Sequence, residues 1–404
     1  MRRPFCAAVS PRLAAGLFAA AVAVAPAGGR ADDSVTVRGV YYREASTRVI
    51  QPMMEVRRDS DSGLDVDAHF LVDAITSASM AAGTAVDNIF TEIRDEVGFR
   101  VRRRWERSDL SLAYKYSAES DYWSHSIGAS YGSRLWDDTA ALRVSVGRSF
   151  DTMQAKGPNP PDCHQGPGQT SCWLNTWYAG VSFSQVLSPV MLAQVSYEAA
   201  YLDGYQGNLY RPVPTLNNQI EFLPPHRLRN AITPRIAYYI PATSTGLQLH
   251  YRYYFDFYPG ERATDSDPWL LMGHMIEARV YQQLTPTLEM RLLFRYYRQN
   301  HANFWCAPPN KPTTLPPTEF CAMNTSPPSG YATGAVYFTA DPKLGPLHTE
   351  YPEVQLVWEA DALREVPFLR WFAAGSFEIS YGYYFQNTSF GNAHVLQTGY
   401  RLPY

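Results

Sequence analysis

The sequence predicts an all-β membrane protein, a transmembrane antiparallel up-and-down β-barrel of about 16 strands that follows a cleaved signal peptide. Three observations lead to this prediction. Segments of about ten residues alternate apolar and polar side chains again and again. After Asp32, no apolar run approaches the roughly 20 residues of a spanning helix. Short and long connections alternate along the chain, as they do between the two ends of an outer-membrane barrel.

The first 31 residues have the pattern of a secretory signal peptide. Arg2 and Arg3 precede an apolar run from Leu13 to Ala27, and small residues lie just before Asp32. The alternative is a membrane anchor, but this run of 15 residues is shorter than the roughly 17 to 25 that a spanning helix requires. We therefore divide the chain into a signal peptide, 1–31, and an outer-membrane barrel, 32–404.

Composition and charge exclude two classes of protein. Aromatic residues make up 14% of the 404 residues and charged residues only 18%, against about 25% in ordinary soluble domains. This balance argues against disorder. The formal net charge of −3 leaves no basic stripe for nucleic acid, so no nucleic-acid partner is expected.

Four cysteines follow the predicted signal peptide. Cys163 and Cys172 share one Gly/Pro-rich stretch, and Cys306 and Cys321 share another. An even number of cysteines on an exported chain suggests disulfides, and we pair them within each stretch. Their spacing matches neither a zinc ribbon nor a haem attachment site, so we expect them to stiffen two loops.

The alternation divides the mature chain into sixteen predicted strands. Leu288, Met290, Leu292, Phe294 and Tyr296, for example, alternate with a second set that contains Glu289, Arg291 and Arg295. The run 335–339 is a candidate for one more strand, so we give a range of 14 to 18. The predicted strands are 34–44, 47–57, 64–76, 91–104, 107–118, 122–134, 139–150, 174–186, 189–202, 227–240, 246–257, 269–283, 286–300, 349–360, 371–386 and 392–404.

A soluble β-sandwich would also alternate, and the connections favour the barrel. Tight links are expected near 58–63, 104–107, 134–139, 186–189, 241–245 and 283–286. Long ones are expected near 77–90, 151–174, 203–226 and 303–348. Seven of the nine tryptophans, Trp269 among them, fall near predicted strand ends, where an aromatic girdle would meet the membrane interface.

The end of the chain resembles the signal by which outer-membrane barrels are recognised for assembly. Leu396, Tyr400, Leu402 and the terminal Tyr404 share one face of the last predicted strand. We therefore expect the barrel assembly machinery to bind this strand. Outer-membrane lipids are the other expected partners, and the sequence does not fix an oligomeric state.

Several stretches resemble a bacterial family known as domain of unknown function 3570. They are 41–44 (YYRE), 72–79 (VDAITSAS), 226–232 (HRLRNAI), 251–256 (YRYYFD) and 295–304 (RYYRQNHANF). The resemblance runs from about residue 38 to the C-terminus and fades in the stretches 151–173 and 303–348. It implies an outer-membrane barrel, and it carries over no activity or catalytic residue.

If the apolar faces meet lipid, the opposite faces line a lumen. On four neighbouring strands this set is rich in arginine, and on a strand in the opposite part of the barrel it is acidic. A wall of one charge selects solutes by sign, so we expect a porin-like channel or binding lumen for small solutes. The alternative is that neighbouring strands satisfy each other's charges. The predicted lining residues are Arg229, Arg235, Arg252, Asp256, Glu277, Arg279, Glu289, Arg291 and Arg295 on the basic side, and Asp67, His69 and Asp73 on the acidic side.

Three other functions stay open at this point. A partner-binding barrel could have its lumen closed by the Pro-rich segment 303–348. A membrane lipid hydrolase would need a serine beside a histidine, yet Ser124 and His125 alternate in facing, and no catalytic motif is present. Asp65, Asp67, His69 and Asp73 could together bind a metal, but successive groups on one strand face are roughly 6.6 to 7 Å apart. We therefore predict no catalytic residue, cofactor or metal.

Overall fold

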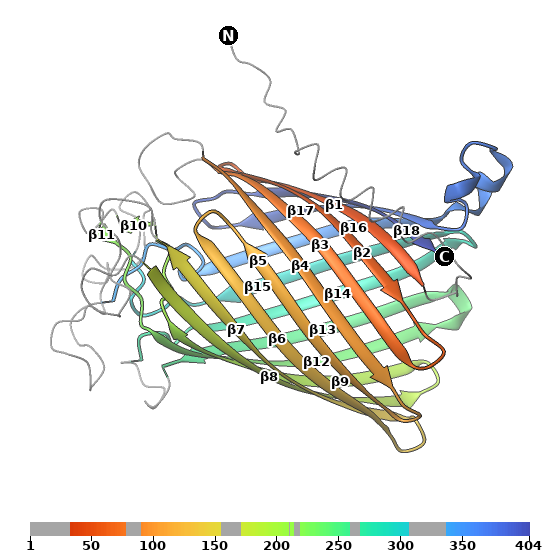
Figure 1. Ribbon diagram of the computed structural model, residues 1–404, viewed down its shortest axis with the longest axis horizontal. Coiled ribbons are helices and arrows are strands. Elements are labelled where there is room, and N and C mark those ends of the chain that lie inside the picture. Colours follow the sequence, from red (N-terminus) through yellow and green to blue (C-terminus); the bar gives the residue numbers. More distant parts are fainter. Residues whose placement is uncertain are drawn as a thin grey trace, which may run out of the picture.

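The computed structural model describes residues 33–77, 90–154, 171–209, 211–213, 219–258, 267–306 and 337–404. These residues form one closed antiparallel barrel and a small two-stranded sheet (Figure 1). The predicted fold class is therefore confirmed. None of the helical segments in the described ranges is long and apolar enough to cross a membrane. The predicted signal peptide, 1–31, lies outside these ranges.

The barrel has sixteen strands, the predicted number, and β10 (Pro212–Val213) and β11 (Gln219–Ile220) form the small sheet. The barrel strands are β1 (Ser34–Arg43), β2 (Thr47–Arg58), β3 (Leu64–Ser77), β4 (Phe90–Arg104), β5 (Ser108–Ala118), β6 (Tyr122–Leu135), β7 (Ala140–Gln154), β8 (Ser171–Ser188), β9 (Met191–Gly204), β12 (His226–Ile240), β13 (Thr245–Phe257), β14 (Met272–Thr285), β15 (Leu288–Gln299), β16 (Leu347–Glu359), β17 (Ser376–Gln386) and β18 (Ala393–Pro403).

Each barrel strand pairs with the next along the chain, and the first and last strands close the ring. The register of β1 with β18 runs from Ser34 opposite Pro403 to Arg43 opposite His394. Closure leaves no strand edge, so the backbone donors and acceptors of the wall find partners within the sheet. A hydrocarbon environment demands this arrangement because it offers no water to bind an unpaired group.

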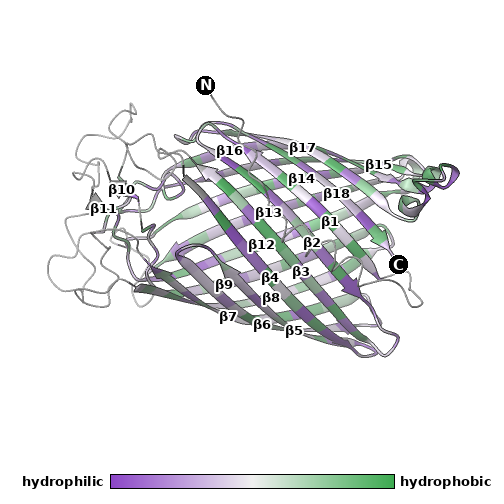
Figure 2. Ribbon diagram, turned by 45° about the horizontal axis from the view of Figure 1, so that its top comes forward, coloured by the Kyte–Doolittle hydropathy of each residue, from purple (hydrophilic) through white to green (hydrophobic). Residues whose placement is uncertain are grey.

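One face of every strand exposes large apolar side chains. Leu112, Val146 and Ile93 are 58%, 57% and 55% exposed, respectively. Figure 2 shows the resulting alternation of hydrophobic and hydrophilic residues along the strands. A soluble sandwich would bury such a face in a core, whereas here it forms the outer surface of the ring.

The two ends of the barrel differ in their connections. At one end, which we call the turn end, most connections between strands are short. They are 59–63, 105–107, 136–139, 189–190, 241–244 and 286–287. The first residue of β1 and the last residue of β18 also lie at this end. The long connections after β3, β7, β9, β13 and β15 lie at the opposite end, which we call the loop end. This asymmetry is the predicted one, and it places the turn end in the periplasm.

One long link lies at the turn end, and it corrects a predicted boundary. Residues 360–375 include the 3-10 helices η4 (Ala360–Glu365) and η5 (Arg370–Phe372), so β17 starts at Ser376 and not at 371. The Phe372 amide donates to the Leu369 carbonyl, an i→i+3 bond that turns the chain. The four apolar residues 371–374 do not alternate, which the sequence-based boundary overlooked.

The described part of the candidate seventeenth strand, residues 337–339, does not form a strand of the barrel. Phe338 makes a single antiparallel bridge to Phe222, and Thr339 makes a single parallel bridge to Trp305, both outside the barrel sheet. Residues 335 and 336 lie outside the described ranges.

Substitutions at two neighbouring residues in the middle of β5 can test which face of the barrel wall meets lipid. Leu112 faces outward, whereas Ala113 faces inward and is also exposed. Leu112→Arg should lower the free energy of unfolding in lipid vesicles by about 2 to 4 kcal/mol, because the charge enters hydrocarbon. Ala113→Arg is the control and should leave it nearly unchanged. Equal losses in urea titrations of the two variants would contradict the assignment of faces.

Candidate functional site

The strand register places all twelve predicted lining residues on the inner face of the barrel. Directly opposite residues in neighbouring strands share a face, so the facing can be followed from strand to strand. Arg57 pairs with Asp67, Asp67 with Arg100, and Arg100 with Ala113. On β12 to β15 the same procedure places Arg229 directly opposite Asp256 and Glu277 directly opposite Arg295 in the strand register.

The acidic wall predicted on β3 is paired with arginines of the adjacent strands. Asp65 is fully buried, and Arg102 and Arg104 hold its oxygens at 2.8 and 2.7 Å. Arg57 Nε lies 3.0 Å from Asp67 Oδ1. Asp73 binds Arg94 and Gln51.

These pairs correct the expectation of an acidic side to the lumen. The arginines at positions 57, 94, 100, 102 and 104 were missed because the strands that carry them were not aligned with β3. The structure favours the alternative that neighbouring strands satisfy one another on this side. It also argues against the metal hypothesis, because each carboxylate of the set already binds a cation.

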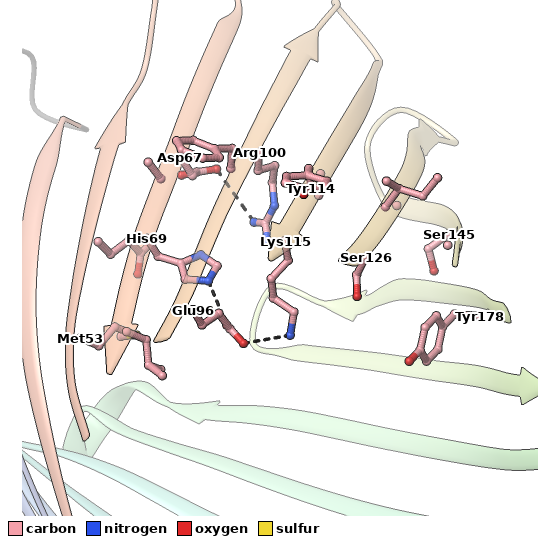
Figure 3. A pocket seen from close by; sticks show the side chains of 18 of the residues that line it. Met53, Asp67, His69, Glu96, Arg100, Tyr114, Lys115, Ser126, Ser145 and Tyr178 are labelled. Atoms are coloured by element: carbon pink, nitrogen blue, oxygen red, sulfur yellow. Dashed lines mark hydrogen bonds and ion pairs between the residues drawn. The ribbon is translucent and has the colours of Figure 1, made fainter. Parts of the chain in front are cut away.

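His69 lies in a small polar network between β3 and β5. Its Nε2 is 3.2 Å from Glu96 Oε1, and Lys115 Nζ is 3.2 Å from Glu96 Oε2 (Figure 3). Gly98, directly opposite His69, makes this possible, since a Cβ there would clash with the imidazole. Glycine on β4 is therefore required by the close approach of the ring.

The inner face of β5 to β9 carries mostly small side chains. They leave a hollow of about 490 Å³ against the wall, bordered by Ala113, Ser126, Gly128, Ser145 and Gly147. Figure 3 shows Ser126, Ser145 and Tyr178 beside the charged residues of β3 to β5. The sequence signal was a serine or glycine at every second position of β6, from Ser124 to Gly132, and the sequence analysis did not use it.

On the basic side, the buried Glu277 binds two arginines. Arg279 Nε lies 2.7 Å from its Oε1, and Arg295 Nη2 lies 2.6 Å from its Oε2. His250 Nδ1 is 3.6 Å from the same carboxylate. One carboxylate therefore offsets part of the charge of two arginines.

The other predicted basic residues vary in their partners. Arg291 pairs with Glu289, and Arg252 reaches across β12 to Glu198 at 2.9 Å. Arg235 donates to the neutral Gln248 at 2.6 Å. Within the described part of the chain, Arg229 and Arg235 form no ion pair, so this wall keeps an excess of positive charge.

A hydrophobic cluster joins the connections at the loop end. Trp269, Phe304, Tyr337 and Leu223 are almost completely buried in it. The Trp269 indole donates to the His226 carbonyl at 2.8 Å and lies 3.9 Å from the Arg227 guanidinium. The prediction that Trp269 belongs to an interfacial girdle is therefore wrong, because the loops bury it.

A buried polar group strengthens this packing. Arg211 lies 3.5 Å from Glu221 and 2.6 Å from Asp341, and Thr339 Oγ1 donates to Glu221 at 2.6 Å. Burial raises the pKa of the Glu221 carboxyl, and the Arg211 charge opposes that rise.

The remaining predicted residues have varied positions. Cys172 and Cys306 are buried, but Cys163 and Cys321 lie outside the described residues, so the two disulfides and their pairing stay a prediction. Leu396, Tyr400 and Leu402 share the outer face of β18, opposite residues of β1, and Tyr404 follows the strand. Their role in assembly stays a prediction.

The hydrolase candidates occupy opposite faces of the wall. Ser124 Oγ lies inside and donates to Asp151 at 2.6 Å, whereas His125 lies outside with its Nδ1 2.8 Å from the Tyr114 hydroxyl. His274 is 2.7 Å from the hydroxyl of Tyr251. Among the residues that the structure describes, no serine pairs with either histidine.

A family model described as "Protein of unknown function (DUF3570)" matches residues 76–322, more than half of the chain. The chain belongs to this family. No curated protein sequence matches this DUF3570 member.

The fold of this DUF3570 barrel recurs in solved structures. A "Bacterial polysaccharide outer membrane secretin" has a TM-score of 0.50 at 7% identity, with 92% of this chain and 98% of that chain covered. OccD3 (OpdP) of Pseudomonas aeruginosa has a TM-score of 0.43 at 11% identity, with 94% and 93% covered. At such identities the likeness concerns the fold alone, and the DUF3570 chain is a bacterial outer-membrane barrel.

Removal of the Glu277 carboxylate should destabilise the barrel strongly. Glu277→Ala leaves Arg279 and Arg295 facing each other without their shared anion, which should cost about 3 kcal/mol of unfolding free energy. Glu198→Ala is the control, because its single exposed pair with Arg252 should cost less than about 1 kcal/mol. Urea unfolding in vesicles measures both losses. Equal losses would mean that the Glu277 cluster does not stabilise the wall.

Proposed function

We propose that this barrel is a porin-like channel that passes small solutes and favours anions. The observation that carries the proposal is the solvent-exposed inner face of β5 to β9. Ala113, Lys115, Ser145, Tyr178 and Glu198 are exposed there although their side chains point into the ring. An interior filled by side chains would bury these positions, whereas barrels of this size hold water.

The preference for anions rests on the wall formed by β12 to β15. Its inner face carries seven arginines against three carboxylates, Asp256, Glu277 and Glu289. Charges that line a water-filled pore concentrate ions of opposite sign, and arginine binds carboxylate or phosphate through two parallel hydrogen bonds. Small organic or inorganic anions are therefore the proposed solutes.

The two arginines without an ion pair give the sharpest test of selectivity. Arg229→Ala with Arg235→Ala should move the reversal potential across a salt gradient toward cations, because uncompensated positive charge leaves the lumen. The measurement uses the purified full chain in a planar bilayer. Arg103→Ala is the control, since Arg103 faces outward at the turn end. An unchanged reversal potential in the double variant would contradict the proposed anion preference.

A second test uses arginines that do have partners. Arg291→Ala with Arg295→Ala also removes two positive charges and leaves Glu289 and Glu277 with fewer cations, so selectivity should again shift toward cations. A wild-type chain that conducts no current under any condition would overturn the channel itself.

The packed loop cluster favours a second candidate, a barrel whose lumen is closed and whose loops bind a partner. If this cluster roofs the lumen, Trp269→Ala with Phe304→Ala should raise single-channel conductance by loosening it. The channel proposal expects unchanged conductance. Tyr238→Ala on the outer surface is the control for general loss of stability.

A further inference from the structure

A belt of basic side chains runs along part of the outer surface at the loop end. Its members are His274 on β14, Arg298 on β15, His348 on β16, His394 on β18, Arg43 on β1 and Arg48 on β2. All six are exposed, and the register places them on the same face as the exposed apolar side chains. We call them the basic belt.

The basic belt begins where the apolar surface ends. The next outward residues toward the turn end are Ile276, Tyr41, Ile50 and Leu396 on β14, β1, β2 and β18. One such step along a strand is roughly 6.6 to 7 Å. On these four strands the belt lies within one step of the apolar surface, at the level of lipid headgroups, whereas on β16 Glu350 follows His348 on the outer face.

Basic side chains face each other within the belt, and Arg43 and Arg48 are two facing positive charges. Arg43 is directly opposite Arg48 on one side and His394 on the other, and Arg298 lies between His274 and His348. Such neighbours destabilise a sheet unless an anion offsets them.

The described carboxylates do not supply that anion. None of them pairs with Arg43, Arg48 or Arg298, and within the belt only His348 approaches one, Glu350, at 3.5 Å. The inner face of the barrel differs from the belt, because nearly all arginines on the inner face bind a carboxylate or an amide.

Two of the three belt histidines, His274 and His394, are held through Nδ1. The Tyr251 hydroxyl is 2.7 Å from His274 Nδ1, and the Tyr381 hydroxyl is 2.8 Å from His394 Nδ1. Each tyrosine thus fixes the ring by Nδ1, and Nε2 remains for an external ligand.

A hollow on the outer surface joins the β14 to β16 part of the belt. It has a volume of about 610 Å³ and is lined by His274, Arg298 and His348 together with Asn300 and Asn387. Arg298 and two histidines therefore border one concave site beside the apolar surface, while the Asn300 and Asn387 amides bond to backbone carbonyls.

We propose that the basic belt binds the phosphate groups of a phosphorylated glycolipid in the outer leaflet. Arginine presents a fork of donors that matches a phosphate, and the apolar surface just below the belt would hold the acyl chains. On β6 an outward histidine, His125, recurs beside a tyrosine, but the outward arginine of the next strand has other partners. Arg148, the outward arginine of β7, is stacked on Phe150 and Trp177 and bonded to Asn175. The glycolipid would therefore bind one side of the barrel.

Titration of the full chain in detergent with lipid A, its dephosphorylated form and inorganic phosphate tests the proposal. The combined variant Arg43→Ala, Arg48→Ala, Arg298→Ala should bind lipid A about 100-fold more weakly, because each arginine at a membrane surface contributes roughly a factor of five. Arg58→Ala should bind as the wild type does. Arg58 lies on the same strand and face as Arg48, at the turn end.

Three results would overturn the proposal. The combined variant could bind lipid A as tightly as the wild type does. Dephosphorylated lipid A could bind the wild type as tightly as lipid A does, or inorganic phosphate could bind it as tightly as lipid A does. If the combined variant does not fold, Arg48→Ala against Arg58→Ala repeats the comparison with an expected loss of about fivefold. Conductance should not change in these variants, because the belt lies outside the lumen. The result is therefore independent of the channel proposal.

Discussion

The constraint on which this structure depends is that hydrocarbon cannot satisfy a backbone hydrogen bond. The pairing of β1 with β18 meets this demand by leaving no open edge. Closure then divides the side chains into two populations. One population faces lipid and must be apolar, and the other faces an enclosed space where polar groups are tolerated. The alternating sequence follows from this division, and so does the absence of a conventional hydrophobic core inside the barrel wall.

The same closure decides how charge is handled inside. Strands that are neighbours in the sheet present their inner side chains side by side, so a carboxylate on one strand meets arginines on the next. Asp65 and Glu277 are buried for this reason, each held by two arginines. A polar lumen is therefore compatible with a stable wall, and the proposed selectivity rests on the few charges that are left over, such as Arg229 and Arg235.

At the outer surface the balance is reversed. Arg43 and Arg48 lie opposite each other at the hydrocarbon border, where no described carboxylate offsets them. An exposed arginine in water requires no partner, but like charges placed in register at a lipid headgroup layer favour an anionic lipid. In the two proposals, charge inside the barrel acts on solutes and charge outside it acts on lipid.

The class of fold, a count of about 16 strands within a range of 14 to 18, and the facing of the alternating strands could be predicted from the sequence, because a period of two is local and hydrocarbon enforces it along the chain. The strand prediction missed the start of β17, where Trp371 and Phe372 do not alternate. Only the tertiary structure decided which residues lie opposite one another. Register depends on the stagger between strands, which no single segment encodes, so the arginines that neutralise Asp65, the burial of Trp269 and the juxtaposition of Arg43 with Arg48 emerged only from the assembled sheet.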